Sequence, residues 1–170
     1  MSTAEGMDSA RIAEIQARSD RASPAPWTSF WEGRDHTSGS SFIMTGEDDI
    51  DPVGMSVDDQ DFAAYARQAV PQLLQELRRR LDAGAAARVL TLNDLVEIER
   101  RCEAASPAPW TKFPRSSPDA RPESTVTTGG DTGSFELRGG TEHDHDFIAH
   151  ARQDLPWLVA KCADFNDFRR

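Results

Sequence analysis

The chain has 170 residues, a net charge of −10 with histidine counted as neutral, and 38% hydrophobic residues. The acidic balance argues against a general nucleic-acid-binding protein, because phosphates require a basic surface. The length fits one ordinary domain or two small ones.

No apolar run approaches the length of a membrane-spanning helix, and the start of the chain (MSTAEGMDSA) lacks the basic and apolar regions of a signal peptide. The two cysteines, Cys102 and Cys162, fall on apolar faces of expected helices, which is typical of buried thiols in a reducing compartment. We therefore expect a cytoplasmic protein with no membrane partner.

An internal repeat is the most informative feature: the string ASPAPW at 22–27 recurs unchanged at 105–110. The similarity extends outward from both copies and defines a first unit over 8–82, a linker over 83–90 and a second unit over 91–168. Each unit alone is close to the lower size limit for independent folding, so we expect the two to share one core in a single globular domain.

Each unit is expected to begin with a helix, because Asp8 and Thr91 are residue types that favour the N-cap. The helix must end before Pro24 or Pro107, since a residue that precedes proline is disfavoured in helical dihedrals. In both helices a glutamate precedes an arginine by four residues, an ion-pair spacing. The pairs are Glu14 with Arg18 and Glu97 with Arg101.

The proline-rich exit of each helix delivers a tryptophan, Trp27 or Trp110, to a fixed place. Two interpretations stay open for these side chains: they anchor the core, or they form a stacking wall of a ligand pocket.

The middle of each unit is expected to form short strands, because β-branched and aromatic runs alternate there with glycines. The predicted strands are 28–31, 41–45 and 54–57 in the first unit and 111–113, 124–128 and 134–137 in the second, with a hairpin turn at 129–133 and exposed loops at 32–40 and 114–123.

Each unit closes on two helices. Asp61 and Asp146 open a short helix, and Pro71 and Pro156 are placed in the first turn of a new helix, with Asp154 as a candidate N-cap. The sequence thus predicts an α+β fold of two tandem repeats, each a helix, a short antiparallel sheet and a helix pair, packed as a pseudo-twofold intramolecular dimer.

Several polar residues occur in both units, and duplicated surface positions are expected to diverge unless they have a role. One interpretation is an Arg–Asp bridge between helices of a unit; the other is a pair of arginines that face each other across the seam and bind an anion. The candidate ligand-binding residues are Arg67, Arg152, Trp27, Trp110, Arg18 and Arg101.

A histidine cluster is present once. His143, His145 and His150 are potential metal ligands, and the string around them partly resembles the HxHxDH motif of metallo-β-lactamase-type hydrolases, with Phe147 in place of the final histidine. The corresponding string of the first unit, DDQD at 58–61, has no histidine, so we expect an acidic helix start and no metal or cofactor.

The chain resembles an uncharacterised family of small actinobacterial and phage proteins with the motifs A-[ST]-P-x-P-W and D-F-[IA]-A-x-A-R-x-D-[LV]-P. The resemblance covers nearly the whole chain twice and departs at Ala69, where the motif has Asp. It implies a phage or accessory-genome context and offers no activity to carry over. The matching residues of the first unit are Pro24, Pro26, Trp27, Asp61, Phe62, Ala66, Arg67, Pro71 and Leu73.

No catalytic residue is nominated by any motif, and three hypotheses about function follow. The first is a non-enzymatic binding or sequestering protein for a small anionic, nucleotide-like ligand. The second is a protein-blocking immunity or anti-defence factor whose acidic surface covers a basic partner. The third is a metal-dependent hydrolase that uses His143, His145 and His150.

Overall fold

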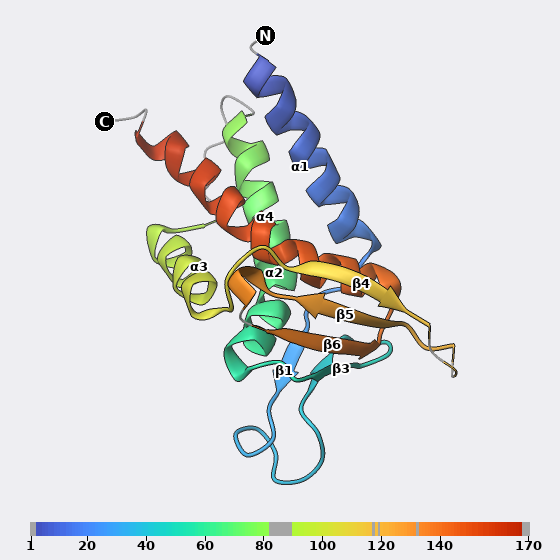
Figure 1. Cartoon of the computed structure of the whole chain (residues 1–170). Coiled ribbons are helices and arrows are strands. Elements are labelled where there is room, and N and C mark those ends of the chain that lie inside the picture. The colour runs from blue at the N-terminus through green and yellow to red at the C-terminus, as the bar shows by residue number, and fades with distance from the viewer. Residues whose placement is uncertain (1–2, 82–89, 117, 119, 132, 168–170) are drawn as a thin grey trace.

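The computed structural model describes residues 3–81, 90–116, 118, 120–131 and 133–167 (Figure 1). Within them the chain forms four α-helices and one six-stranded antiparallel sheet, so the expected α+β class is confirmed. The helices are α1 (Thr3–Arg21), α2 (Val57–Leu81), α3 (Leu92–Ala104) and α4 (Glu142–Asp167). The strands are β1 (Thr28–Phe30), β2 (Phe42–Met44), β3 (Ile50–Val53), β4 (Thr111–Arg115), β5 (Glu123–Thr127) and β6 (Ser134–Gly139), with a 3₁₀ turn at Gly129–Asp131.

The sheet has the strand order β1-β2-β3-β6-β5-β4. Its centre is the antiparallel pair of β3 and β6, in which Pro52 lies opposite Leu137. Each unit therefore contributes three neighbouring strands, and the two sets join into one sheet through their third strands.

The third strand of the first unit lies earlier than the sequence predicted. We expected it at 54–57, but β3 ends at Val53, and Gly54 has a φ of 84°. A positive φ suits glycine and turns the chain, so Gly54 follows the strand instead of opening it.

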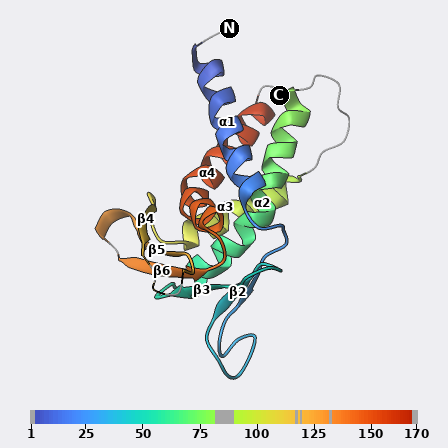
Figure 2. The same ribbon diagram turned by 90° about the vertical axis from the view of Figure 1, so that its right-hand side faces the viewer.

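Helices α2 and α4 lie against one face of the sheet, and α1 and α3 pack on these two helices (Figures 1 and 2). Burial alternates along the strands: Val126 and Leu137 are fully buried, whereas Val53 and Phe113 are about half exposed. This alternation is typical of an antiparallel sheet with one face in the core and one in solvent.

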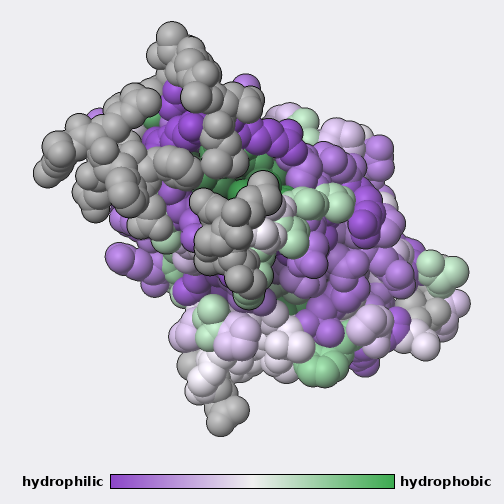
Figure 3. Space-filling view, turned by 90° about the horizontal axis from the view of Figure 1, so that it is seen from above, coloured by the Kyte–Doolittle hydropathy of each residue, from purple (hydrophilic) through white to green (hydrophobic). Residues whose placement is uncertain are grey.

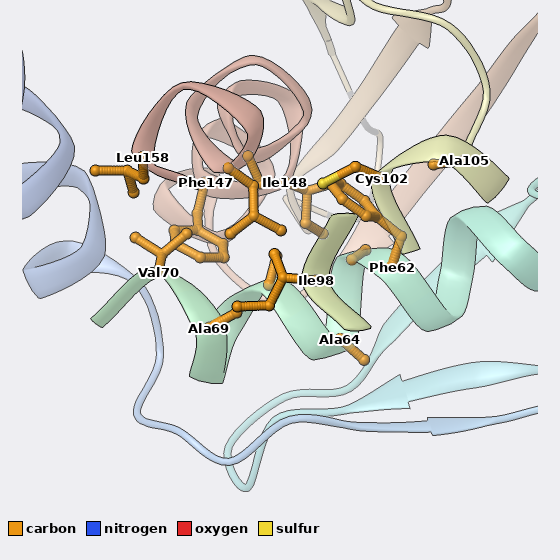
Figure 4. Packing of buried hydrophobic residues seen from close by; sticks show 14 of the residues in the cluster. Phe62, Ala64, Ala69, Val70, Ile98, Cys102, Ala105, Phe147, Ile148 and Leu158 are labelled. Atoms are coloured by element: carbon orange, nitrogen blue, oxygen red, sulfur yellow. The ribbon is translucent and has the colours of Figure 1, made fainter. Parts of the chain in front are cut away.

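One hydrophobic cluster takes residues from both units and from helices as well as strands. Figure 4 shows part of it, where Val70 on α2, Ile98 on α3 and Ile148 on α4 point toward one another. Both cysteines are buried as expected, and burial raises the pKa of each thiol to about 11. The surface seen from above, over the helices, is mostly hydrophilic (Figure 3).

The predicted break at the prolines is wrong. Pro71 and Pro156 lie inside α2 and α4, each of which is one continuous helix. A proline inside a helix removes one backbone hydrogen bond. Here the flanking residues Val70 and Leu155 are almost fully buried, so packing of the helix holds it in place.

Of the three N-cap predictions, the one for Thr91 is confirmed and those for Asp8 and Asp154 are wrong. Thr91 caps α3 with a full capping box, in which its hydroxyl accepts from the Asp94 amide and the Asp94 carboxylate accepts from the Thr91 amide. Asp8 is not an N-cap, because α1 begins upstream at Thr3. Asp154 is not one either, since it lies inside α4. The linker expected over 83–90 falls outside the described residues except for Leu90, which is buried.

Candidate functional site

The first ASPAPW segment is held by Arg67 and Trp27, which both donate to the Ser23 carbonyl oxygen, Arg67 Nε at 2.8 Å and Trp27 Nε1 at 3.1 Å. The other guanidinium nitrogens of Arg67 donate to the hydroxyl and carbonyl oxygens of Ser19, both at 3.1 Å. Arg67 is only 6% exposed, and burial lowers its pKa. Its hydrogen-bonding groups are therefore used within the fold.

The second ASPAPW segment repeats this arrangement. Arg152 Nε donates to the Ser106 carbonyl oxygen at 2.8 Å, and Trp110 Nε1 donates to the same oxygen at 3.1 Å. Gln153 Nε2 donates to the Trp110 carbonyl oxygen at 2.9 Å. Both tryptophans are 2% exposed, as core anchors are, and neither lines the two cavities described below.

A buried aspartate of the opposite unit binds the serine of each ASPAPW segment. Asp144 accepts from the Ser23 amide at 2.6 Å and from the Ser23 hydroxyl at 2.7 Å. Asp59 accepts from the amide and the hydroxyl of Ser106, both at 2.6 Å. Sequence reasoning missed these contacts, although the two aspartates and the two serines are all duplicated.

Arg18 makes a contact that the sequence did not predict. Its guanidinium donates to Asp154 on α4 at 3.0 Å, so the expected pairing with Glu14 is wrong. The Asp154 side chain is 8% exposed and that of Arg18 is 20% exposed, so this ion pair is partly buried.

Arg101, the duplicate of Arg18, has a different environment. Its Nε donates to Glu97 at 3.0 Å, which confirms the predicted pair, and its guanidinium lies 4.1 Å from the centre of the Tyr65 ring. Where the second unit has Asp154, the first unit has Ala69, and Arg101 has no corresponding carboxylate.

The three histidines do not converge. His145 is fully buried, where Nδ1 accepts from the Ser124 hydroxyl at 2.8 Å and Nε2 donates to the Gly139 carbonyl oxygen at 2.7 Å. His143 and His150 are exposed. Among the described residues, no group of three or more His, Cys, Asp or Glu side chains is placed to hold a metal ion.

Two hollows lined by described residues are candidate sites. The first is a cavity of about 170 Å³ between α2 and α3, which we call the α2–α3 cavity. It is lined by Asp58, Asp61, Phe62, Arg100, Arg101 and Ala104, and Arg101 is the one predicted ligand residue among these six.

The second hollow is a groove of about 380 Å³ at the end of β3, beside the β1–β2 loop, which we call the β3 groove. Its lining includes Trp31, Glu32, Asp51, Val53 and Arg138. In the register of the sheet Asp51 lies opposite Arg138, and Val53 is 47% exposed, so the groove borders the face that the helices leave uncovered.

The charges of the β3 groove are not balanced. The Arg138 guanidinium donates to Glu136 at 2.8 Å. In contrast, the carboxylates of Glu32 and Asp51 make no hydrogen bond or ion pair with any described residue. The groove is therefore lined by Trp31 and by two acidic residues whose carboxylates lack an ion-pair partner among the described residues.

No protein-family model, curated protein or solved structure matches this chain. In the part of the chain that the structure describes, none of the helices has both the length and the apolar character to span a bilayer.

Proposed function

We propose that this protein is a non-enzymatic binding protein that engages a basic segment of a partner protein at the β3 groove. One observation carries the proposal: the groove is lined by Trp31 and by Glu32 and Asp51, whose carboxylates have no ion-pair partner among the described residues. Carboxylates attract a lysine or arginine side chain, and an aromatic ring adds a cation–π contact.

The surroundings of the groove favour the same partner. Glu47, Asp48 and Asp49 are exposed in the turn between β2 and β3, next to the strand that carries Asp51. Together with the net charge of −10, this acidic turn would speed the approach of a basic protein at low ionic strength.

The two sheet edges are poorly suited to strand addition. Gln60 Nε2 donates to the Phe30 carbonyl oxygen of β1 at 3.1 Å, and Pro114 removes an amide donor from β4. The uncovered face of the sheet is thus a better surface for the partner than either edge.

The alternative hypotheses receive less support. A small anionic ligand held by Arg67 and Arg152 would have to displace the hydrogen bonds that these arginines make to Ser23 and Ser106. A hydrolase based on the histidine cluster would need its members to meet, whereas His145 is buried away from the other two.

We also propose that the two units are a pseudo-twofold pair formed by duplication. The support is the repetition of contacts: Trp27 meets Phe147 and Phe62 meets Trp110, each with ring centroids 5.6 Å apart and nearly perpendicular planes. In the context of a phage or accessory genome, such a compact acidic scaffold would serve to mask a basic partner.

The proposal is tested with defined peptides. Deca-arginine and deca-glutamate are titrated into the protein and into the double variant E32Q/D51N, at low and at high salt. Deca-arginine is expected to bind in a salt-dependent way, and the double variant to bind it about tenfold more weakly, at roughly 0.5–1 kcal/mol for each exposed charge.

The matched control is E47Q/D49N, which removes the same charge from the exposed acidic turn outside the groove lining. It is expected to lose much less affinity than E32Q/D51N. Equal losses in the two double variants would show a diffuse electrostatic attraction and contradict a specific groove.

A further inference from the structure

We propose that the α2–α3 cavity binds a small zwitterion, such as a free α-amino acid, with its carboxylate on Arg101 and its ammonium group on Asp58. This site is separate from the β3 groove: no residue lines both.

The two duplicated arginines, Arg18 and Arg101, differ in their carboxylate partners, and this difference indicates that Arg101 binds the carboxylate of the ligand. Arg18 has its charge balanced inside the fold by Asp154, at 3.0 Å. The position equivalent to Asp154 is Ala69 in the first unit, so the ion pair of Arg101 is with Glu97, whose side chain is 39% exposed and also pairs with Arg100. Asp61 also attracts Arg101 across the cavity, but its carboxylate is already bound by Arg34. An anion from outside the chain would supply the missing partner.

Arg101 is also held ready for such a partner. Its Nε is fixed by Glu97 and its guanidinium lies over the Tyr65 ring. No described residue accepts a hydrogen bond from its two terminal nitrogens. These two nitrogens are the fork that binds a carboxylate through two parallel hydrogen bonds, and a fork fixed in advance loses little entropy on binding.

The α2 side of the cavity, which carries Asp58 and Asp61, indicates that the same ligand also has a positive group. Asp61 is bound by both terminal nitrogens of Arg34, at 2.6 and 3.0 Å, and is thereby neutralised. Asp58 is exposed and forms no hydrogen bond or ion pair with any described residue, and the Arg100 guanidinium of the same cavity attracts it only at longer range. A carboxylate without a direct partner repels a phosphate dianion and attracts an ammonium group.

The size and the floor of the cavity restrict the ligand further. Its volume is about 170 Å³, and its walls are mostly polar, because Phe62 is almost fully buried and exposes little of its ring. The small volume and the charged walls favour a small amino acid with a short side chain.

The test is isothermal titration calorimetry of the full-length protein with each of the twenty L-amino acids. Acetate, ethylammonium and inorganic phosphate are titrated separately. At least one small amino acid is expected to bind about tenfold more tightly than acetate or ethylammonium, because each of these carries one of the two charged groups. R101Q and D58N are each expected to weaken this binding about tenfold or more.

Three variants, A69D, A69N and R18Q, separate the site from general effects on the fold. A69D supplies the carboxylate that the second unit already has and is expected to occupy Arg101 and reduce binding, whereas A69N, of the same shape without the charge, is expected to bind more tightly than A69D. R18Q removes the duplicated arginine outside the cavity and is expected to keep the wild-type affinity. Thermal melting of each variant confirms that it is folded.

Three results would overturn the proposal: no amino acid binds, R101Q binds as tightly as the wild type, or inorganic phosphate binds as tightly as the best amino acid. The groove variant E32Q/D51N is expected to bind the amino acid with wild-type affinity. Failure of the amino-acid proposal can therefore be distinguished from failure of the basic-partner proposal.

Discussion

Asp144 on α4 accepts two hydrogen bonds from Ser23, which lies 121 residues earlier in the chain just after α1. The carboxylate is fully buried, and its second oxygen also accepts from the Thr141 amide at the start of α4. One side chain therefore caps its own helix and fastens the turn that leaves the first helix.

Replacement of Asp144 by alanine is expected to lower the free energy of unfolding by about 2–4 kcal/mol. The variant leaves the buried Ser23 amide and hydroxyl without their acceptor, and an unsatisfied buried group costs more than the net value of a hydrogen bond. Urea denaturation followed by circular dichroism measures the change. D49A, at an exposed position, is the control, and equal midpoints for the two variants would contradict the prediction.

Stability is expected to fall in mild acid because of His145. Burial lowers the pKa of this imidazole, so the folded state favours the neutral form that donates to the Gly139 carbonyl oxygen. The contribution is complete above the unfolded-state pKa of about 6.5 and is lost as pH falls below that value toward the lower folded-state pKa, by at most about 1.4 kcal/mol per pH unit.

The variant H145Q tests this pH dependence. The first unit has Gln60 at the equivalent position, where its amide donates to the Phe30 carbonyl oxygen, so a glutamine side chain suits this place in a unit. Urea midpoints measured from pH 8 to pH 5 are expected to decline less for H145Q than for the wild type. An identical decline in both proteins would exclude His145 as the source.

The duplicated arginines are expected to differ in their effect on stability. R18Q removes the nearer ion-pair partner of the partly buried Asp154 and leaves it only the longer contact with Arg11, at 4.0 Å, so it is expected to cost about 1–3 kcal/mol. R101Q removes a partly exposed pair with Glu97 and a contact with the Tyr65 ring, and is expected to cost less than about 1 kcal/mol. Differential scanning calorimetry of the two variants measures the difference, and a larger loss for R101Q would contradict it.

Local signals predicted much of the fold. The cap at Thr91, the end of each first helix before ASPAPW and the β6 strand follow from residues that are neighbours in sequence. The continuity of α2 and α4 through Pro71 and Pro156 was not predictable in this way, because a proline disfavours a helix locally and only the burial of the surrounding turns compensates.

The candidate sites were less predictable than the fold. Sequence reasoning selected Arg67 and Arg152 because they are duplicated, and the structure shows that both donate to backbone carbonyls. The β3 groove was not predicted, since Trp31, Glu32 and Asp51 become neighbours only when the β1–β2 loop folds beside β3.

The sequence by itself determined that the ASPAPW segment and the residues around it recur, and which residues the two copies share, because a repeat is visible in the order of residues alone. Only the tertiary structure decided what each shared residue does. Arg18 meets Asp154, and Arg101 faces a cavity, although the two arginines stand at the same place in their units. The reason is physical: the partners of a side chain come from other elements, and a single exchange such as Asp154 to Ala69 changes the charge that surrounds it.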